Sequence, residues 1–181
     1  LLIYGGQNAS QANDDKLAYD YYSTYVESAS NSLFKETVDG KDANLGQVAR
    51  VAAYMAVKNK DFAHANQYID IAMADTATAK DAEEIKIYIL QQQLHSKADT
   101  LRYIDELKKM NATKYFASIA SLYNQIGEKA LSEKMINDEI ANNPGNKMAY
   151  AIKGETFMND RKWDEAIEAF KKTVAIDPTF V

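Results

Sequence analysis

The residues that could perform acid–base or metal chemistry are scattered along this chain. Its two histidines, His64 and His95, stand far apart, the first beside small residues and the second at the end of a predicted helix. Adjacent carboxylates occur at Asp14/Asp15, Glu83/Glu84 and Asp164/Glu165. Each pair lies in a predicted amphipathic helix, where a solvated face or a favourable charge at the helix start accounts for it.

No catalytic or cofactor signature joins these residues. The chain has no H-E-x-x-H zinc motif, no glycine-rich phosphate loop and no G-x-S-x-G sequence. It also has no cysteine, which excludes a disulfide, a thiolate ligand and a cysteine nucleophile. A hydrolase on a helical scaffold would need a nucleophile beside a base, and no such pair is present. We therefore predict a non-enzymatic protein with no metal and no cofactor.

Composition narrows the class of protein further. Of 181 residues, 46% are hydrophobic and 26% charged, a balance typical of a folded chain, and the scarcity of Gly (7) and Pro (2) favours helices. A net charge of −5 argues against a general nucleic-acid binder, which needs a basic face. No run approaches the roughly 18 apolar residues of a membrane span.

The elements that must position any site are helices. Between residues 161 and 178 an apolar stripe with helical spacing is formed by Trp163, Ala166, Ile167, Phe170 and Val174, and Pro178 marks its end. A second stripe, on a helix between the sequences NNPGN and NDR, comprises Tyr150, Gly154 and Phe157. Because the connection is short, the two helices are predicted to pack antiparallel as a hairpin.

This hairpin recurs with a period of 34 residues. Pro144 precedes Pro178 by that distance, and the same step relates Phe116 to Tyr150 and Tyr123 to Phe157. Small residues recur in the second helices (Ala65, Ala98, Ser132, Ala166) and in the first helices (Ala53, Ala120, Gly154), while Phe170 corresponds to Ile136 and Ile69. Small residues are expected where two helices cross closely, because a larger side chain would separate them.

The pattern resembles the tetratricopeptide repeat (TPR) family. The copy at 147–181 is the closest, matching at Tyr150, Gly154, Phe157, Ala166, Phe170 and Pro178 and departing at Lys153 and Thr173. Further copies occupy 46–78, 79–112 and 113–146. That at 79–112 is divergent, since Arg102 replaces an apolar residue and Tyr103 or Ile104 must substitute for it. The resemblance implies an all-α fold, a right-handed α-solenoid of antiparallel helix hairpins.

Both ends of the chain differ from the repeats. Residues 14–35 predict one more helix, a degenerate repeat or cap, with Asn13 as its N-cap and with Leu17, Tyr21, Tyr25 and Ala29, then Leu33 or Phe34, as its stripe; a loop to residue 45 follows. In residues 1–13, Ser10 and Ala12 have the spacing that signal peptidase reads, so this segment is either a signal-peptide remnant of an exported protein or an ordinary apolar stretch. No polar capping helix follows Asp177, and we expect self-association or a further segment at that end.

The resemblance also implies a function. In the family, the first helices of the hairpins line a concave groove that takes an extended peptide or a partner's helix. The corresponding residues here are Arg50, Tyr54, Val57, Lys80, Glu83, Ile87, Leu90, Lys114, Ala117, Ser121, Asn124, Ala151, Glu155 and Met158. The clamp with which some members hold the carboxylate of chaperone tails is absent. The alternative is a structural spacer or scaffold subunit of a larger assembly, with no groove ligand.

Overall fold

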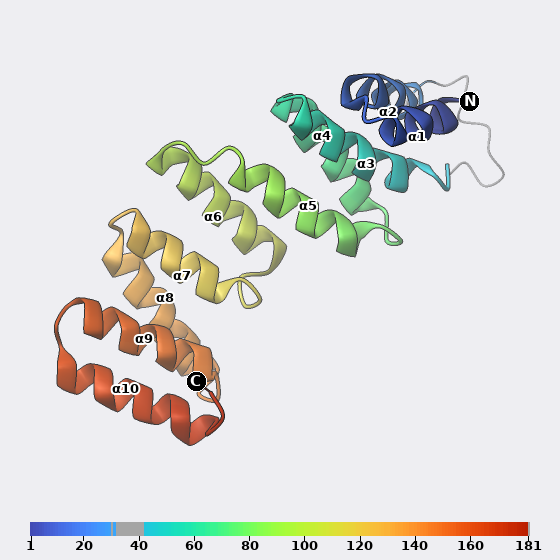
Figure 1. Ribbon diagram of the computed structural model, residues 1–181. Coiled ribbons are helices and arrows are strands. Elements are labelled where there is room, and N and C mark those ends of the chain that lie inside the picture. The colour runs from blue at the N-terminus through green and yellow to red at the C-terminus, as the bar shows by residue number, and fades with distance from the viewer. Residues whose placement is uncertain (30, 32–41, 181) are drawn as a thin grey trace. The chain divides into compact units, whose positions relative to one another are not determined.

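The fold is described from a computed structural model that places residues 1–29, 31 and 42–180 (Figure 1). Helices account for most of these residues and no strand occurs among them. The helices are α1 (Leu2–Gln11), α2 (Asp15–Ala29), α3 (Leu45–Lys58), α4 (Phe62–Ala74), α5 (Ala79–Gln91), α6 (Lys97–Asn111), α7 (Phe116–Gln125), α8 (Lys129–Asn142), α9 (Lys147–Asn159) and α10 (Trp163–Ile176). The described chain falls into two compact units, Leu1–Gln93 and Leu94–Val181.

The same type of turn joins the two helices in each of four hairpins within the ranges that the structure places. These hairpins are α1/α2, α3/α4, α7/α8 and α9/α10. A residue with positive φ follows the first helix of each, at Asn13, Lys60, Gly127 and Arg161. The next backbone N–H then donates to the carbonyl oxygen five residues earlier, over 2.8 to 2.9 Å, as in a Schellman motif. Residues 92–96, between α5 and α6, contain no positive-φ residue. The connection between α5 and α6 thus differs from the other four, and the repeat bounds 79–112 stay a prediction.

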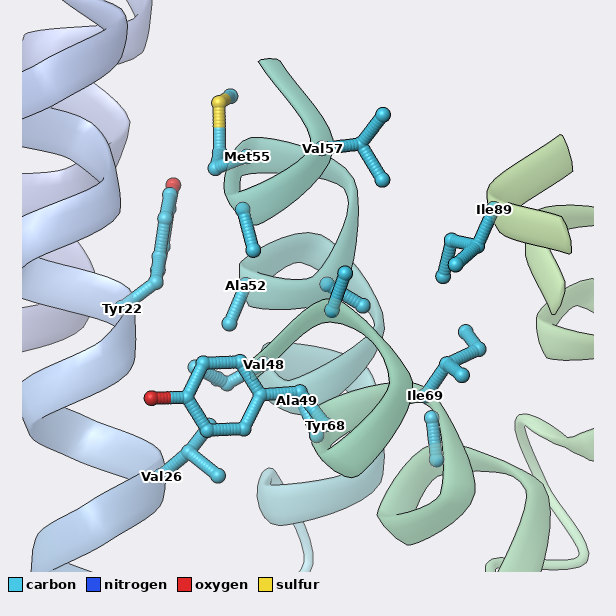
Figure 2. Packing of buried hydrophobic residues seen from close by; sticks show 14 of the residues in the cluster. Tyr22, Val26, Val48, Ala49, Ala52, Met55, Val57, Tyr68, Ile69 and Ile89 are labelled. Atoms are coloured by element: carbon cyan, nitrogen blue, oxygen red, sulfur yellow. The ribbon is translucent and has the colours of Figure 1, made fainter. Parts of the chain in front are cut away.

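Small residues let the helices of the first unit approach closely. Four alanines of α3 are fully buried, at Ala49, Ala52, Ala53 and Ala56. Figure 2 shows Tyr22 and Val26 of α2 on one side of α3, and Ile69 of α4 together with Ile89 of α5 on the other. A continuous hydrophobic core therefore runs from α1 to α5.

The α1/α2 hairpin belongs to this core. Gly6 and Ala9 of α1 are buried, and a Cβ on Gly6 would lie 2.5 Å from ring carbons of Tyr22, so α1 crosses α2 very closely. Residues 2–11 therefore form a repeat-like first helix, which periodicity alone had not identified. Export of the protein stays a prediction.

Partly buried hydrogen bonds join α2 to the α3/α4 hairpin. The Tyr19 hydroxyl donates to Asp61 Oδ2 over 2.7 Å, and the Tyr68 hydroxyl donates to Glu27 Oε1 over 2.6 Å. Burial, and then the neighbouring carboxylate, raises the pKa of both tyrosines well above the usual value. Tyr25, which donates to Asp42 over 2.8 Å, has its pKa raised to about 12 by the same two causes. Tyrosines of α2 thus pack and hydrogen-bond, as expected for core residues.

The second unit is built from α6 to α10 with the same small residues at its crossings. Ser132 of α8 and Ala166 of α10 are buried, as are Ala120 of α7 and Gly154 of α9. The Ser132 hydroxyl donates to the Ala120 carbonyl oxygen over 2.9 Å, which satisfies the buried polar group. In α6, Tyr103 and Ile104 are buried and Arg102 is exposed, so the predicted substitution at that place is confirmed.

Four details of the sequence prediction are wrong. Ala98 is exposed, because α6 turns other residues inward. The N-cap of α2 is Asp14, whose Oδ1 accepts from the Leu17 N–H over 3.0 Å, while Asn13 has a left-handed backbone. The buried stripe of α2 is Ala18, Tyr22 and Val26, one position round from that predicted, and Leu17 is exposed. Finally, α3 begins at Leu45, within the range predicted as a loop. Residues 30 and 32–41, which include the predicted stripe residues Leu33 and Phe34, lie outside the described part.

Candidate functional site

The predicted groove residues are divided between the two units. Those from Arg50 to Val57 lie on α3, and those from Lys80 to Leu90 lie on α5, which contacts α3 within the first unit. The others lie at or on α7 (Lys114, Ala117, Ser121, Asn124) and on α9 (Ala151, Glu155, Met158) in the second unit. The structure thus brings the α3 and α5 residues together, and one groove shared by both units stays a prediction.

Three of the predicted residues belong to the interior and not to a surface. Val57, Leu90 and Ala151 are buried, and Val57 is part of the hydrophobic core of the first unit. They fall on the side of each first helix that turns toward the interior, which spacing alone does not distinguish from an adjoining exposed position. We remove these three from the candidate site.

An exposed aromatic pair marks the α3/α5 surface. Tyr54 and Tyr88 are 41% and 39% exposed, and their ring centroids lie 6.2 Å apart at an interplanar angle of 35°. Tyr88 is absent from the predicted set, although it lies one full period of 34 residues after Tyr54. A strict step of 34 from Tyr54, instead of 33, would have found it. We call Tyr54, Tyr88 and the flanking Arg50 and Lys58 the aromatic face.

Two cations on α3 flank Tyr54 by one turn on either side. Lys58 Nζ lies 5.8 Å from the Tyr54 ring centroid and 2.7 Å from Asp15 Oδ1 of α2. The hydrogen bond to Asp15 raises the pKa of Lys58, which keeps the ammonium charged. Arg50 contacts the amide oxygen of Gln47 at 3.4 Å and forms no ion pair within the described ranges. Its guanidinium is therefore available to a carboxylate of a partner.

The predicted residues of the second unit form no comparable cluster. Ser121, Glu155 and Met158 are exposed, and Asn124 is half-buried with a side-chain oxygen that accepts no hydrogen bond. A cavity of about 30 Å³ between α8, α9 and the start of α10 is lined by Asn137, Lys153 and Phe157, among others. This volume holds one water molecule and no organic ligand.

His64 and the Asp14/Asp15 pair have structural partners. Asp61 caps α4: its Oδ2 lies 2.7 Å from His64 Nδ1 and also accepts from Tyr19. Burial raises the pKa of Asp61, but the hydrogen bonds from Tyr19 and His64 outweigh it and leave that pKa below its usual value. At the start of α2, Asp14 caps the helix and Asp15 binds Lys58.

The placed part of the chain contains no candidate metal centre and no candidate membrane span. No group of three or more His, Cys, Asp or Glu residues could hold a metal ion among residues 1–29, 31 and 42–180. Over the same ranges, no helix is long and apolar enough to cross a bilayer.

Comparison with known proteins bears on the fold. No protein-family model matches the chain, and no curated protein matches it in sequence. Two crystal structures of MamA, a TPR-containing protein, match its fold. One is 15% identical over 96% of this chain and 94% of its own, with a TM-score of 0.52; the other is 15% identical over 98% and 90%, with a TM-score of 0.53. The chain folds as an α-solenoid.

The α-solenoid assignment confirms the predicted fold class, and at 15% identity it shows the fold alone. Helix α3 is the first helix of the α3/α4 hairpin, and α5 follows that hairpin and contacts α3 within the first unit. The aromatic face lies on α3 and α5, two of the helices that carry the groove residues predicted from sequence.

Proposed function

We propose that the chain is a non-enzymatic protein-interaction module of the TPR type, and that its aromatic face binds an extended peptide or a partner's helix. The observation that carries this proposal is the exposed contact between Tyr54 and Tyr88. Tyrosine presents a large, rigid contact area with a polar tip, and it is enriched among the residues that dominate binding energy. No core requirement explains two neighbouring tyrosines at the surface.

The charges of the face suggest the chemistry of the ligand. Arg50 and Lys58 stand one turn before and one turn after Tyr54, and Lys58 is already paired with Asp15. Arg50 is the cation that a ligand would engage. The expected ligand is a segment with an apolar or aromatic side chain that contacts the tyrosine pair. A carboxylate before or after that side chain would pair with Arg50.

A peptide-display selection on the intact chain tests the proposal. Peptides enriched on it are then titrated against three proteins: the wild type, a Tyr54→Ala/Tyr88→Ala variant, and a Tyr4→Ala control. Tyr4 is an exposed tyrosine of the same unit that lies outside the aromatic face. Truncating two central aromatic side chains should weaken binding at least about tenfold, and the control should bind as the wild type does.

Two results would overturn the assignment. Equal binding by the double variant would place the peptide site on another surface, including the α7 and α9 residues predicted from sequence. Failure to enrich any peptide would favour the spacer or scaffold function instead. Circular dichroism of each variant shows that a loss of binding is not a loss of folding.

A further inference from the structure

The last helix exposes an apolar stripe that no other described element covers. Trp163, Ile167 and Val174 of α10 are 58%, 51% and 49% exposed. At 100° per residue they fall within about 40° of one another on the helix surface, so they form one line. The side of α10 that packs against α9 carries Ala166, Ala169 and Thr173, which are buried. The single apolar stripe predicted from the sequence of this helix therefore divides into two surfaces. One packs inside the hairpin and the other faces outward.

In the preceding hairpin, a helix covers part of the equivalent surface. Ile136 of α8, one period before Phe170, is buried and lines a small cavity with Lys153 and Phe157 of α9, whereas Glu133, one period before Ile167, is exposed. Helix α9 packs against α8 on this side, but no described helix packs against α10 on the corresponding side. A helix is accordingly the shape that fits the stripe.

Charge on the flank of the stripe selects which helix fits. Asp164 and Lys171 are seven residues apart, which is two turns, and both lie on the same side of Ile167. In an antiparallel pair of identical helices, a two-fold axis near Ile167 places Asp164 of each copy opposite Lys171 of the other. In a parallel pair this flank of one copy would lie on the opposite side of the interface from that of the other, so Asp164 and Lys171 would not meet. Lys171 contacts Glu168 over 2.7 Å, but this pair is about two-thirds exposed and contributes little, so Lys171 can exchange partners.

We infer that two copies of this chain associate through α10, with their helices antiparallel and each Ile167 against the Ile167 of the second copy. The interface is isologous: Trp163 and Val174 at its ends meet each other across the axis, and two Asp164–Lys171 pairs border it. A single pair of helices buries a small area, so the association is weak and reversible. This surface is separate from the aromatic face.

Sedimentation velocity over a concentration series of the full chain tests the inference. The wild type should pass from monomer to dimer with rising concentration. An Ile167→Asp/Val174→Asp variant should remain monomeric over the whole series. Leu131→Asp, which places the same charge on an exposed apolar residue of α8 away from the stripe, is the matched control and should dimerise as the wild type does. Circular dichroism verifies folding of each variant.

A charge-exchange experiment tests the antiparallel arrangement itself. Lys171→Asp gives a copy with two acidic flank positions, and Asp164→Lys gives one with two basic positions. Each alone should dimerise at least about tenfold more weakly than the wild type, and an equimolar mixture should recover the wild-type association. A monomeric wild type, which would leave the stripe to a different helix, overturns the inference. A dimer that survives Ile167→Asp/Val174→Asp also overturns it. An equimolar mixture that does not regain the wild-type association overturns the antiparallel Asp164–Lys171 pairing.

Discussion

Replacing Gly154 with alanine is the sharpest test of the close helix crossing on which the repeats depend. Gly154 is buried in α9, facing the ring of Phe170 in α10. A Cβ at this position would lie 2.7 Å from Cε1, 2.8 Å from Cζ and 2.9 Å from Cδ1 of that ring. Contacts this short do not persist in folded proteins, so the ring or the helix must move.

Two opposing effects set the magnitude. Alanine inside a helix is favoured over glycine by about 1 kcal/mol. Overpacking a well-fitted contact is unfavourable by about 1–3 kcal/mol. Phe170 is half-exposed and can turn partly outward, which keeps the penalty below the top of that range. We therefore expect Gly154→Ala to lower the free energy of unfolding by about 1 kcal/mol.

The single tryptophan provides the assay. Trp163 begins α10, so its fluorescence during urea denaturation reports on the α9/α10 hairpin. A double-mutant cycle with Phe170→Leu isolates the steric effect. Without the ring, Gly154→Ala should become stabilising by up to about 1 kcal/mol, because only the helix preference remains. Stabilisation by Gly154→Ala in the presence of Phe170 would show that the helices do not cross as closely as described.

Three further predictions concern polar contacts and one turn. Asp70→Asn leaves the ammonium of the buried Lys86, 2.8 Å away, without its carboxylate; we expect a loss of about 1–2 kcal/mol in urea denaturation, whereas Lys86→Met should change stability less. The hydrogen bond from Lys147, with those from Thr179 in the following turn, lowers the pKa of Asp177 from 3.8 to about 2. The stabilisation is therefore complete above about pH 4 and is lost as the pH falls toward 2, and Lys147→Met should reduce this pH dependence of the tryptophan-monitored midpoint. Gly127→Ala should lower stability by about 1 kcal/mol although a Cβ there meets no atom within 4 Å, because φ is +80°; an unchanged midpoint would contradict that strain.

Local pattern predicted much of the fold because a hairpin repeat is built from local interactions. The 34-residue spacing of Gly154, Ala120 and their counterparts follows from crossings between helices that are adjacent in sequence. The left-handed turn residues, Gly127 among them, lie between those same helices. Periodicity located the helices to within a few residues, except where α2 turned its stripe by one position and where α1 carried too weak a signal.

The candidate site was less predictable from pattern. The sequence predicted both Tyr54 and Val57 for the groove, but only Tyr54 is exposed, whereas Val57 is in the core. Tyr88, which contacts Tyr54, was not predicted because a step of 33 residues from α3 to α5 leads to Ile87, whereas the full period of 34 leads to Tyr88. An error of one position rotates a helix by 100°, which is enough to exchange an exposed residue for a buried one.

By itself, the sequence determined that the chain is helical, that its helices pair in hairpins and where small residues permit close crossings, since these properties depend on residues at most one repeat apart. Only the tertiary structure decided which apolar faces are covered. Trp163, Ile167 and Val174 look like core in the sequence and are exposed, because burial depends on whether another helix stands against them. The bond from Tyr19 to Asp61, 42 residues away, likewise exists only because separate hairpins stack.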